Sequence, residues 1–348
     1  MVKLGVMEQN ETIRKFIPPR VVDSIISGVN IIEKHPFLLI FPVLFDVLLW
    51  LGPKINIQAP IMRLYNQFLF DMERVFALYN MPANIAEPLY ELQVPLAEFF
   101  SSYNLLSLAN TFPIGIPGLL SNVNTSVSPL GTSQLIELSS VGNIVSAVFL
   151  LTLIGIILGT VFLHFAAPKN SEDQPRNIFK QLLNSLAYSF VLLVTLVAGF
   201  VVSSFLSSFF AIFLPIFGQL VLFFLVTSLV VLLLPALYAV IPIFMYGQPF
   251  YQAILTSYKV VGLQMRFKLN DNQTIIISPR ILTFTMAIFI LYQGLNIVWL
   301  KLPPIDSWWM ALGILGHAFT STLVLVSCFD FFQKMCEWYH KLTQNEVC

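Results

Sequence analysis

Six long apolar stretches constrain this 348-residue chain more than any other feature of its sequence. A helix needs about 20 apolar residues to cross the hydrocarbon core of a bilayer, and most of the stretches reach or exceed that length. A backbone in hydrocarbon must satisfy its own hydrogen bonds, so these stretches are expected to be helices. The sequence therefore predicts an all-α fold, a polytopic membrane helical bundle of about six transmembrane helices. The predicted spans are residues 36–52, 142–165, 182–213, 217–246, 281–300 and 308–332.

The composition supports a lipid environment. Hydrophobic residues make up 57% of the chain and charged residues only 10%, whereas roughly a quarter of the residues in a soluble protein are charged. The formal net charge is zero, so the chain has no overall basic field that would attract nucleic acid. We expect the lipid bilayer to be its main partner and nucleic acid not to be one.

The distribution of basic residues predicts the orientation in the membrane. Of the 18 Lys and Arg residues, 14 fall on the side that holds both termini and four on the other side. Because basic connections are retained in the cytoplasm, both termini are expected to be cytoplasmic. The same asymmetry fits the cytoplasmic membrane of a bacterium. Tryptophan side chains prefer the membrane interface, and four of them fall at the predicted outer ends of spans: Trp50, Trp299, Trp308 and Trp309.

Several segments between the spans are too apolar for ordinary loops. Residues 21–34, within a cytoplasmic N-terminal segment 1–35, and residues 249–265, within a cytoplasmic segment 247–280, place apolar side chains at helical spacing. Both are predicted to be amphipathic helices that lie in the interface. Residues 333–348 are predicted to be a cytoplasmic tail.

The outer segment 53–141 is predicted to be a helical cap and loop on the membrane surface. Residues 61–79 have a clear helical period, and residues 84–108 continue it less regularly. Residues 111–140 are rich in Pro, Gly, Ser and Asn, so we expect an ordered loop without helix there.

Two polar residues are expected at the depth of the bilayer centre. Asp46 lies in the middle of the first span, and His317 lies at a matching depth in the sixth. Because a buried polar group in hydrocarbon needs a partner, the two are expected to pair. The pair is either a structural clasp between two spans or a relay for protons or cations. Gln293 and Asn296, spaced i and i+3 on the fifth span, are further hydrogen-bond candidates for His317.

Small residues mark the predicted sites of close helix packing. Gly155 and Gly159 form a GxxxG pattern in the second span, and Gly313 and Gly316 lie on the His317 face of the sixth. Pro235 and Pro242 are expected to bend the fourth span.

The sequence predicts no cofactor and no metal site. A single membrane histidine can also ligate a haem or a chlorophyll from one side. A further alternative is therefore an accessory subunit that binds a pigment or haem through His317.

Three elements of the chain stand out together. They read SGVNIIEKHPFLLIFPVLFDVLLWLGP near the start, AILTSYKVV before the fifth span and SWWMALGILGHAFTSTLVL near the end. They resemble a group of uncharacterised bacterial six-span membrane proteins that are distantly similar to the membrane domain attached to some glycerophosphodiester phosphodiesterases. The resemblance implies an interfacial helix that leads into each membrane section, and no known chemistry.

Catalysis is not expected. The sequence contains no Walker A loop, no HExxH and no GxSxG motif, and no paired carboxylates within the predicted spans. The favoured function is a non-catalytic accessory or structural subunit, or an assembly factor, of a larger membrane complex, so other membrane-protein subunits are expected partners. A small secondary transporter or channel that uses Asp46 and His317 is the main alternative.

Overall fold

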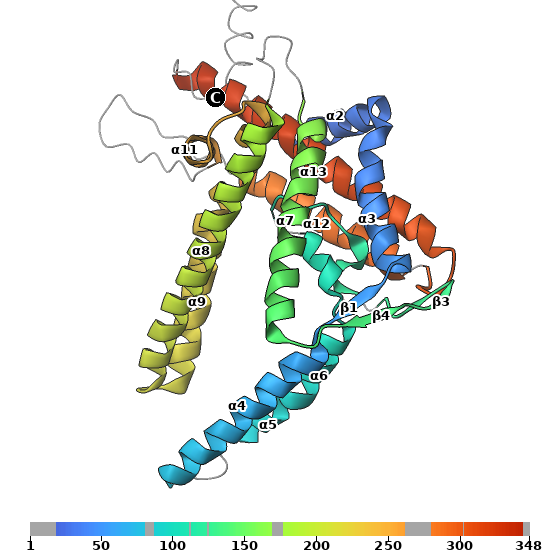
Figure 1. Ribbon diagram of the computed structural model, residues 1–348. Coiled ribbons are helices and arrows are strands. Elements are labelled where there is room, and N and C mark those ends of the chain that lie inside the picture. The colour runs from blue at the N-terminus through green and yellow to red at the C-terminus, as the bar shows by residue number, and fades with distance from the viewer. Residues whose placement is uncertain are drawn as a thin grey trace, which may run out of the picture. The chain divides into compact units, whose positions relative to one another are not determined.

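A computed structural model describes residues 19–80, 87–110, 113–123, 125–168, 177–261, 280–301 and 303–343. Regular structure in these ranges is almost entirely helical (Figure 1). Five candidate spans are each long and apolar enough to cross a membrane, so the protein is an all-α, multi-pass membrane bundle. They are formed by α7 (Val141–Ala166), α8 (Ile178–Ala211), α9 (Pro215–Leu237) with α10 (Val240–Met245), α12 (Arg280–Lys301) and α13 (Met310–Thr343).

The first predicted span, residues 36–52, is not one long helix. It contains the 3-10 turn η1 (Pro36–Leu39) and the short helix α3 (Ile40–Leu51). Twelve residues of helix reach only about 18 Å, well short of the ~30 Å hydrocarbon core. This segment is long and apolar enough to cross a membrane only when it is taken together with α2 (Val21–Lys34). The chain bends by 95° at the break between the two. The two helices form either a sixth, broken span or a re-entrant loop.

The chain divides into two compact units. The first unit contains Met1–His35, Thr160–Leu291 and Thr322–Cys348, and the second contains Pro36–Gly159 and Tyr292–Ser321. Helices α7, α12 and α13 contribute residues to both.

A helical hairpin dominates the first unit. Helices α8 and α9 pack along each other (Figure 1). Gly218 permits their close approach at the turn, where a methyl group would lie 2.6 Å from the Cβ atom of Ala211. In each of the two spans of this hairpin, only 11% of the most apolar 18-residue stretch is buried. Most of the apolar surface of the hairpin is therefore not covered by the described residues.

The proline-rich end of the fourth candidate span is broken. Helix α9 ends at Leu237 and α10 begins at Val240. Proline has no N–H group, so carbonyl groups near Pro235 and Pro242 lose helical partners. Two tyrosine hydroxyls bind carbonyls close to the break. Tyr188 donates to the Ala236 carbonyl at 2.8 Å, which also accepts the Ala239 N–H, and Tyr258 donates to the Leu232 carbonyl at 2.6 Å. Helix α11 (Phe250–Val261), which carries Tyr258, lies in the segment predicted to be an amphipathic helix.

The last helix continues beyond the predicted sixth span. Residues 333–348 were expected to be a tail, but α13 extends to Thr343. The reason is a set of apolar side chains at helical spacing that are buried in the first unit, which stabilise a helix better than an isolated tail. These are Phe332, Met335, Cys336 and Trp338.

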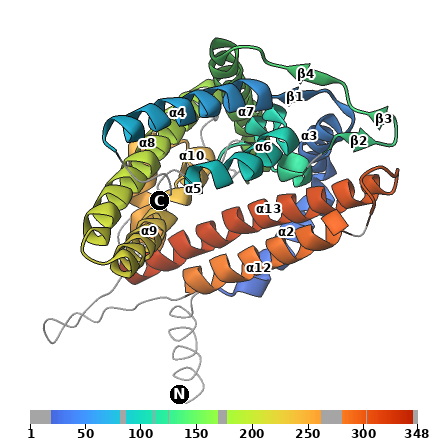
Figure 2. The same ribbon diagram turned by 90° about the horizontal axis from the view of Figure 1, so that it is seen from below.

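The second unit contains the outer segment. Helix α4 (Gln58–Leu78) lies alongside α6 (Gln93–Ser102), with the short helix α5 (Glu87–Glu91) leading into it (Figure 2). A small core joins this segment to α7, where Ile57, Leu105 and Ile144 are buried together. Leu105 begins the 3-10 helix η3 (Leu105–Ala109).

Residues 111–140 contain more regular structure than expected. A 3-10 helix, η4, spans Leu119–Asn122. Strand β1 (Lys54–Asn56) pairs in parallel with β4 (Leu135–Glu137), with Lys54 opposite Leu135. Strands β2 (Val127–Ser128) and β3 (Gly131–Thr132) form a two-stranded antiparallel turn. These strands are two or three residues long, which is too short to show the alternation of apolar and polar residues that predicts a strand.

Candidate functional site

The candidate site is centred on Asp46, in the middle of α3. The apolar run IFPVLFDVLLWL forms this helix, and its proline lies in the first turn, where a missing N–H group costs little. Asp46 is fully buried. An acidic side chain at such a position is costly unless every oxygen has a donor.

Three hydrogen bonds satisfy the Asp46 carboxylate. The backbone N–H of Leu119 donates to Oδ2 at 3.0 Å, and the N–H of Leu120 donates to Oδ1 at 3.0 Å. The third donor is His317 on α13, whose Nδ1 atom lies 3.0 Å from Oδ2. His317 is also fully buried. The sequence-based expectation that these two residues lie close together therefore agrees with their geometry in the second unit.

A tyrosine extends the pair to a third helix. The hydroxyl of Tyr292, on α12, lies 3.4 Å from His317 Nε2. With Nδ1–H donating to Asp46, a neutral imidazole has its acceptor at Nε2 and faces the Tyr292 hydroxyl. The result is a chain of polar groups from Asp46 through His317 to Tyr292.

The described residues show no direct bond from His317 to Gln293 or Asn296, the two candidates on α12. Gln293 is exposed, whereas the partly buried Asn296 side chain forms a hydrogen bond with Tyr292 and so joins the chain of polar groups one step from His317. The helical period explains the difference. Tyr292, Asn296 and Trp299 share one face of α12, spaced i, i+4 and i+7, whereas Gln293 is turned away by one residue.

The two loop amides that bind Asp46 were not anticipated from the sequence. They begin η4, and Gly118 precedes them. A methyl group at Gly118 would lie 2.7 Å from the ring of Phe45 and 2.6 Å from the Ser121 hydroxyl. Only glycine therefore lets this loop approach α3 so closely. The one signal in the sequence was the run of prolines and glycines at Pro113–Gly118, which indicates a tight irregular backbone.

The GxxxG glycines of α7 hold the same loop. A methyl group at Gly155 would lie 2.6 Å from the Ala109 carbonyl oxygen, and one at Gly159 only 1.6 Å from the Ile114 carbonyl oxygen. The pattern was expected to pack against another helix. In the second unit it packs instead against the backbone between η3 and η4, the segment that leads to the Asp46 amides.

Gly313 and Gly316 of α13 pack against Trp299. A methyl group at Gly313 would lie 2.4 Å from the Trp299 carbonyl oxygen, and one at Gly316 would lie 2.6 Å from the indole ring. The indole Nε1–H of Trp299 donates to the Thr320 hydroxyl at 3.0 Å. These contacts fix α13 against α12 on either side of His317.

No group of three or more His, Cys, Asp or Glu side chains that could hold a metal ion occurs in the described ranges. Both nitrogens of His317 face protein groups, Asp46 on one side and Tyr292 on the other. The arrangement can therefore hold α3, α12, α13 and the loop together, and it offers a short path along which a proton can pass.

Comparisons of the chain with protein-family models, with curated proteins and with solved structures found no match.

Proposed function

We propose that the protein is a non-catalytic, structural or accessory subunit, or an assembly factor, of a larger complex in a bacterial cytoplasmic membrane, with both termini in the cytoplasm. The observation that carries the proposal is the closed environment of Asp46 and His317. Both side chains are fully buried, and the carboxylate has three donors. A transport site must instead exchange its ligand with water. The pair is suited to a clasp that holds three helices and a loop in one arrangement.

The uncovered surface of the α8–α9 hairpin supports association with other membrane subunits. Phe205 on α8 and Phe223 on α9 are among its most exposed side chains. Little of the most apolar stretch of either helix is buried. Helices associate within membranes through van der Waals contacts between surfaces of complementary shape, and an uncovered helix surface is available for them. We assign this surface to the transmembrane helices of a partner subunit.

Photo-crosslinking in intact membranes tests this assignment. A photoreactive residue at position 205 or 223 is expected to form discrete protein adducts. The matched control is position 192, where Leu192 is buried on the same helix and should react only within the chain. Adducts with lipid alone at 205 and 223, together with a clean monomer after purification in mild detergent, would contradict the proposal.

A second candidate function is a small secondary transporter or channel. It is favoured by the line of three proton-carrying groups, Asp46, His317 and Tyr292, on three different helices. We place it second because transport needs an aqueous path, and the open hollow described below is lined by none of these residues. A haem or chlorophyll ligand at His317 ranks third, because each ring nitrogen already faces a protein group.

A further inference from the structure

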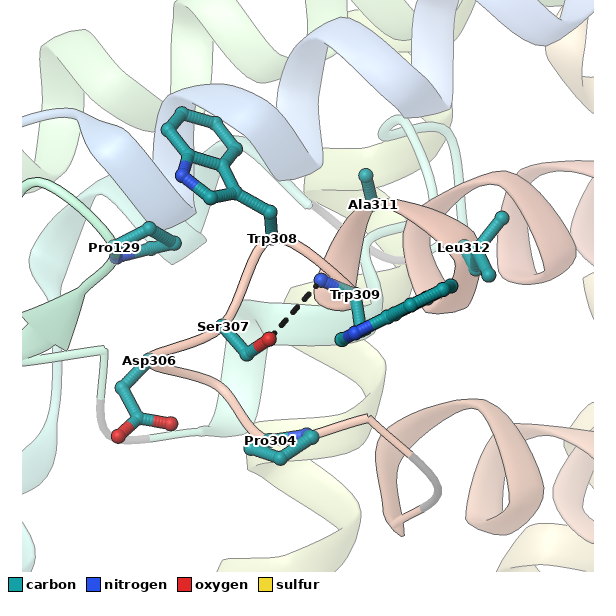
Figure 3. Close-up of a pocket in the computed structure, with 8 residues that line it drawn as sticks. All are labelled: Pro129, Pro304, Asp306, Ser307, Trp308, Trp309, Ala311 and Leu312. Carbon is teal, nitrogen blue, oxygen red and sulfur yellow. Dashed lines mark hydrogen bonds between the residues drawn. The ribbon is translucent and has the colours of Figure 1, made fainter.

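An open hollow of about 760 Å³ lies beside the connection between α12 and α13 (Figure 3). This connection joins the ends of two candidate membrane spans, so it lies where membrane meets water. All residues that line the hollow belong to the second unit. They are Pro129, Pro304, Asp306, Ser307, Trp308, Trp309, Ala311 and Leu312.

The connection is held in a defined conformation. The Ser307 N–H donates to the Pro304 carbonyl at 3.1 Å, and the Trp309 N–H donates to the Ser307 hydroxyl at 3.3 Å. The indole of Trp50 donates to the Ile305 carbonyl at 2.7 Å. The loop is therefore fixed by bonds within itself and to α3.

This loop presents two large aromatic rings outward. Trp308 is 60% exposed and Trp309 is 68% exposed. Trp308 meets the ring of Trp50 edge to face, with centroids 5.7 Å apart. In Figure 3 the Trp309 ring is seen edge-on and extends toward Leu312, while the Trp308 ring points to the other side of the loop. A rigid loop that exposes indole faces is suited to a ligand that binds aromatic rings.

Asp306 adds a negative charge to the hollow that these rings line. Its side chain is exposed and lines the hollow. Within the described ranges it has no ion-pair partner. Indole faces attract cations, and quaternary ammonium groups are commonly recognised by aromatic side chains. A carboxylate that lines the same hollow as two tryptophans favours an organic ammonium group over an anion.

We propose that this hollow binds the ammonium group of a zwitterionic lipid headgroup, either phosphocholine or phosphoethanolamine. The neighbouring surface favours a lipid over a free cation. Leu312 and Leu315 follow the hollow along α13 and are both exposed. At a spacing of i and i+3 they lie on one side of the helix. A lipid with its headgroup at Asp306 can lay an acyl chain along them.

Calorimetric titration of the full chain in a maltoside detergent tests the proposal. Three probes are compared: dihexanoyl phosphatidylcholine, dihexanoyl phosphatidylglycerol and free choline, each with a protein-free micelle blank. We expect the phosphatidylcholine to bind about tenfold more tightly than the other two, because it alone combines the ammonium group with acyl chains.

Two variants locate the site. Asp306→Asn and Trp309→Leu are each expected to weaken phosphatidylcholine binding about three- to tenfold, with little effect on phosphatidylglycerol. Both side chains are exposed, so folding should be unaffected. The matched control is Asp71→Asn, which removes an exposed carboxylate on α4 outside the hollow and should change nothing.

The outcomes separate the possible sources of the ligand. Phosphatidylcholine binding that weakens in both variants but not in the control supports the site. Choline binding as tightly as phosphatidylcholine would overturn the assignment to a lipid. Equal affinity for both lipids, or an unchanged affinity in Asp306→Asn, would overturn the ammonium site itself.

Discussion

Asp46 Oδ2 and His317 Nδ1 lie 3.0 Å apart, although 271 positions separate the two residues in the chain. Both are fully buried. The same carboxylate oxygen also accepts the Leu119 N–H, and the other oxygen accepts the Leu120 N–H. One side chain thus joins a helix, a second helix and an irregular loop. A residue with so many buried partners should contribute strongly to stability.

Replacement of Asp46 by Ala should destabilise the folded protein by about 3–5 kcal/mol, because it leaves buried donors without an acceptor. Asp46→Asn keeps one acceptor oxygen and should cost less, about 1–3 kcal/mol, with assembly intact. The free energy of unfolding can be measured by denaturant titration in detergent.

Gln293→Ala is the control for the Asp46 variants. Gln293 lies next to Tyr292 on α12 but is exposed, so its loss should change stability by no more than about 0.5 kcal/mol. An Asp46→Ala protein as stable as Gln293→Ala would show that the buried pair holds nothing together.

Gly159→Ala should destabilise the protein, because the added methyl group would overlap the Ile114 carbonyl oxygen and displace the loop that leads to Asp46. Overpacking of this kind costs about 1–3 kcal/mol or more. Gly294→Ala is the matched control, since no atom lies within 4 Å of its added methyl group. Alanine is the better helix former by about 1 kcal/mol, so the control should be neutral or stabilising. Thermal unfolding of the two variants in the same detergent measures the difference, and equal melting temperatures would contradict the packing described for α7.

Tyr188→Phe should destabilise the break between α9 and α10. The variant removes the buried hydroxyl that donates to the Ala236 carbonyl, which then keeps only the Ala239 N–H as its donor. The expected cost is about 0.5–1.5 kcal/mol, the net contribution of one hydrogen bond. Tyr251→Phe, at an exposed position on α11, is the control. Unfolding free energies that are the same for the two variants would show that this hydrogen bond does not stabilise the break.

The pKa of Tyr90 is raised above its usual value of 10.0, first by its hydrogen bond to Glu73 and then by burial and by the Glu73 charge. The folded state therefore retains the phenolic proton to higher pH than the unfolded chain does. The contribution to stability is complete below about pH 10 and is lost as the pH rises through the raised pKa.

Absorbance of the phenolate during an alkaline titration measures this effect, with Tyr90→Phe used to isolate the Tyr90 signal. In Glu73→Gln the Tyr90 signal should appear at lower pH than in the unchanged protein. The same titration curve in both proteins would rule out the contact between Tyr90 and Glu73.

The transmembrane helices and the buried pair were largely predictable, because both depend on local composition and depth. Apolar runs set the positions of α7, α8, α12 and most of α13. The matching depths of Asp46 and His317 in two spans were enough to suggest that they pair. Nothing beyond the length of each apolar run and the helical rise was needed.

The remaining parts depend on contacts between distant segments. The amides of Leu119 and Leu120 reach Asp46 only because glycines at positions 118, 155 and 159 admit the loop backbone. No local period encodes such a contact. Tyr292 was missed for a simpler reason: the choice of Gln293 followed its polarity rather than the helix face that points toward His317.

Proton flux into proteoliposomes distinguishes the two roles open to Asp46 and His317, a structural clasp and a proton relay. We expect vesicles with the unchanged protein or with Asp46→Asn to take up protons no faster than empty vesicles under an imposed gradient. Flux in the unchanged protein that disappears in Asp46→Asn, while both proteins assemble equally well by size-exclusion chromatography, would contradict the structural clasp.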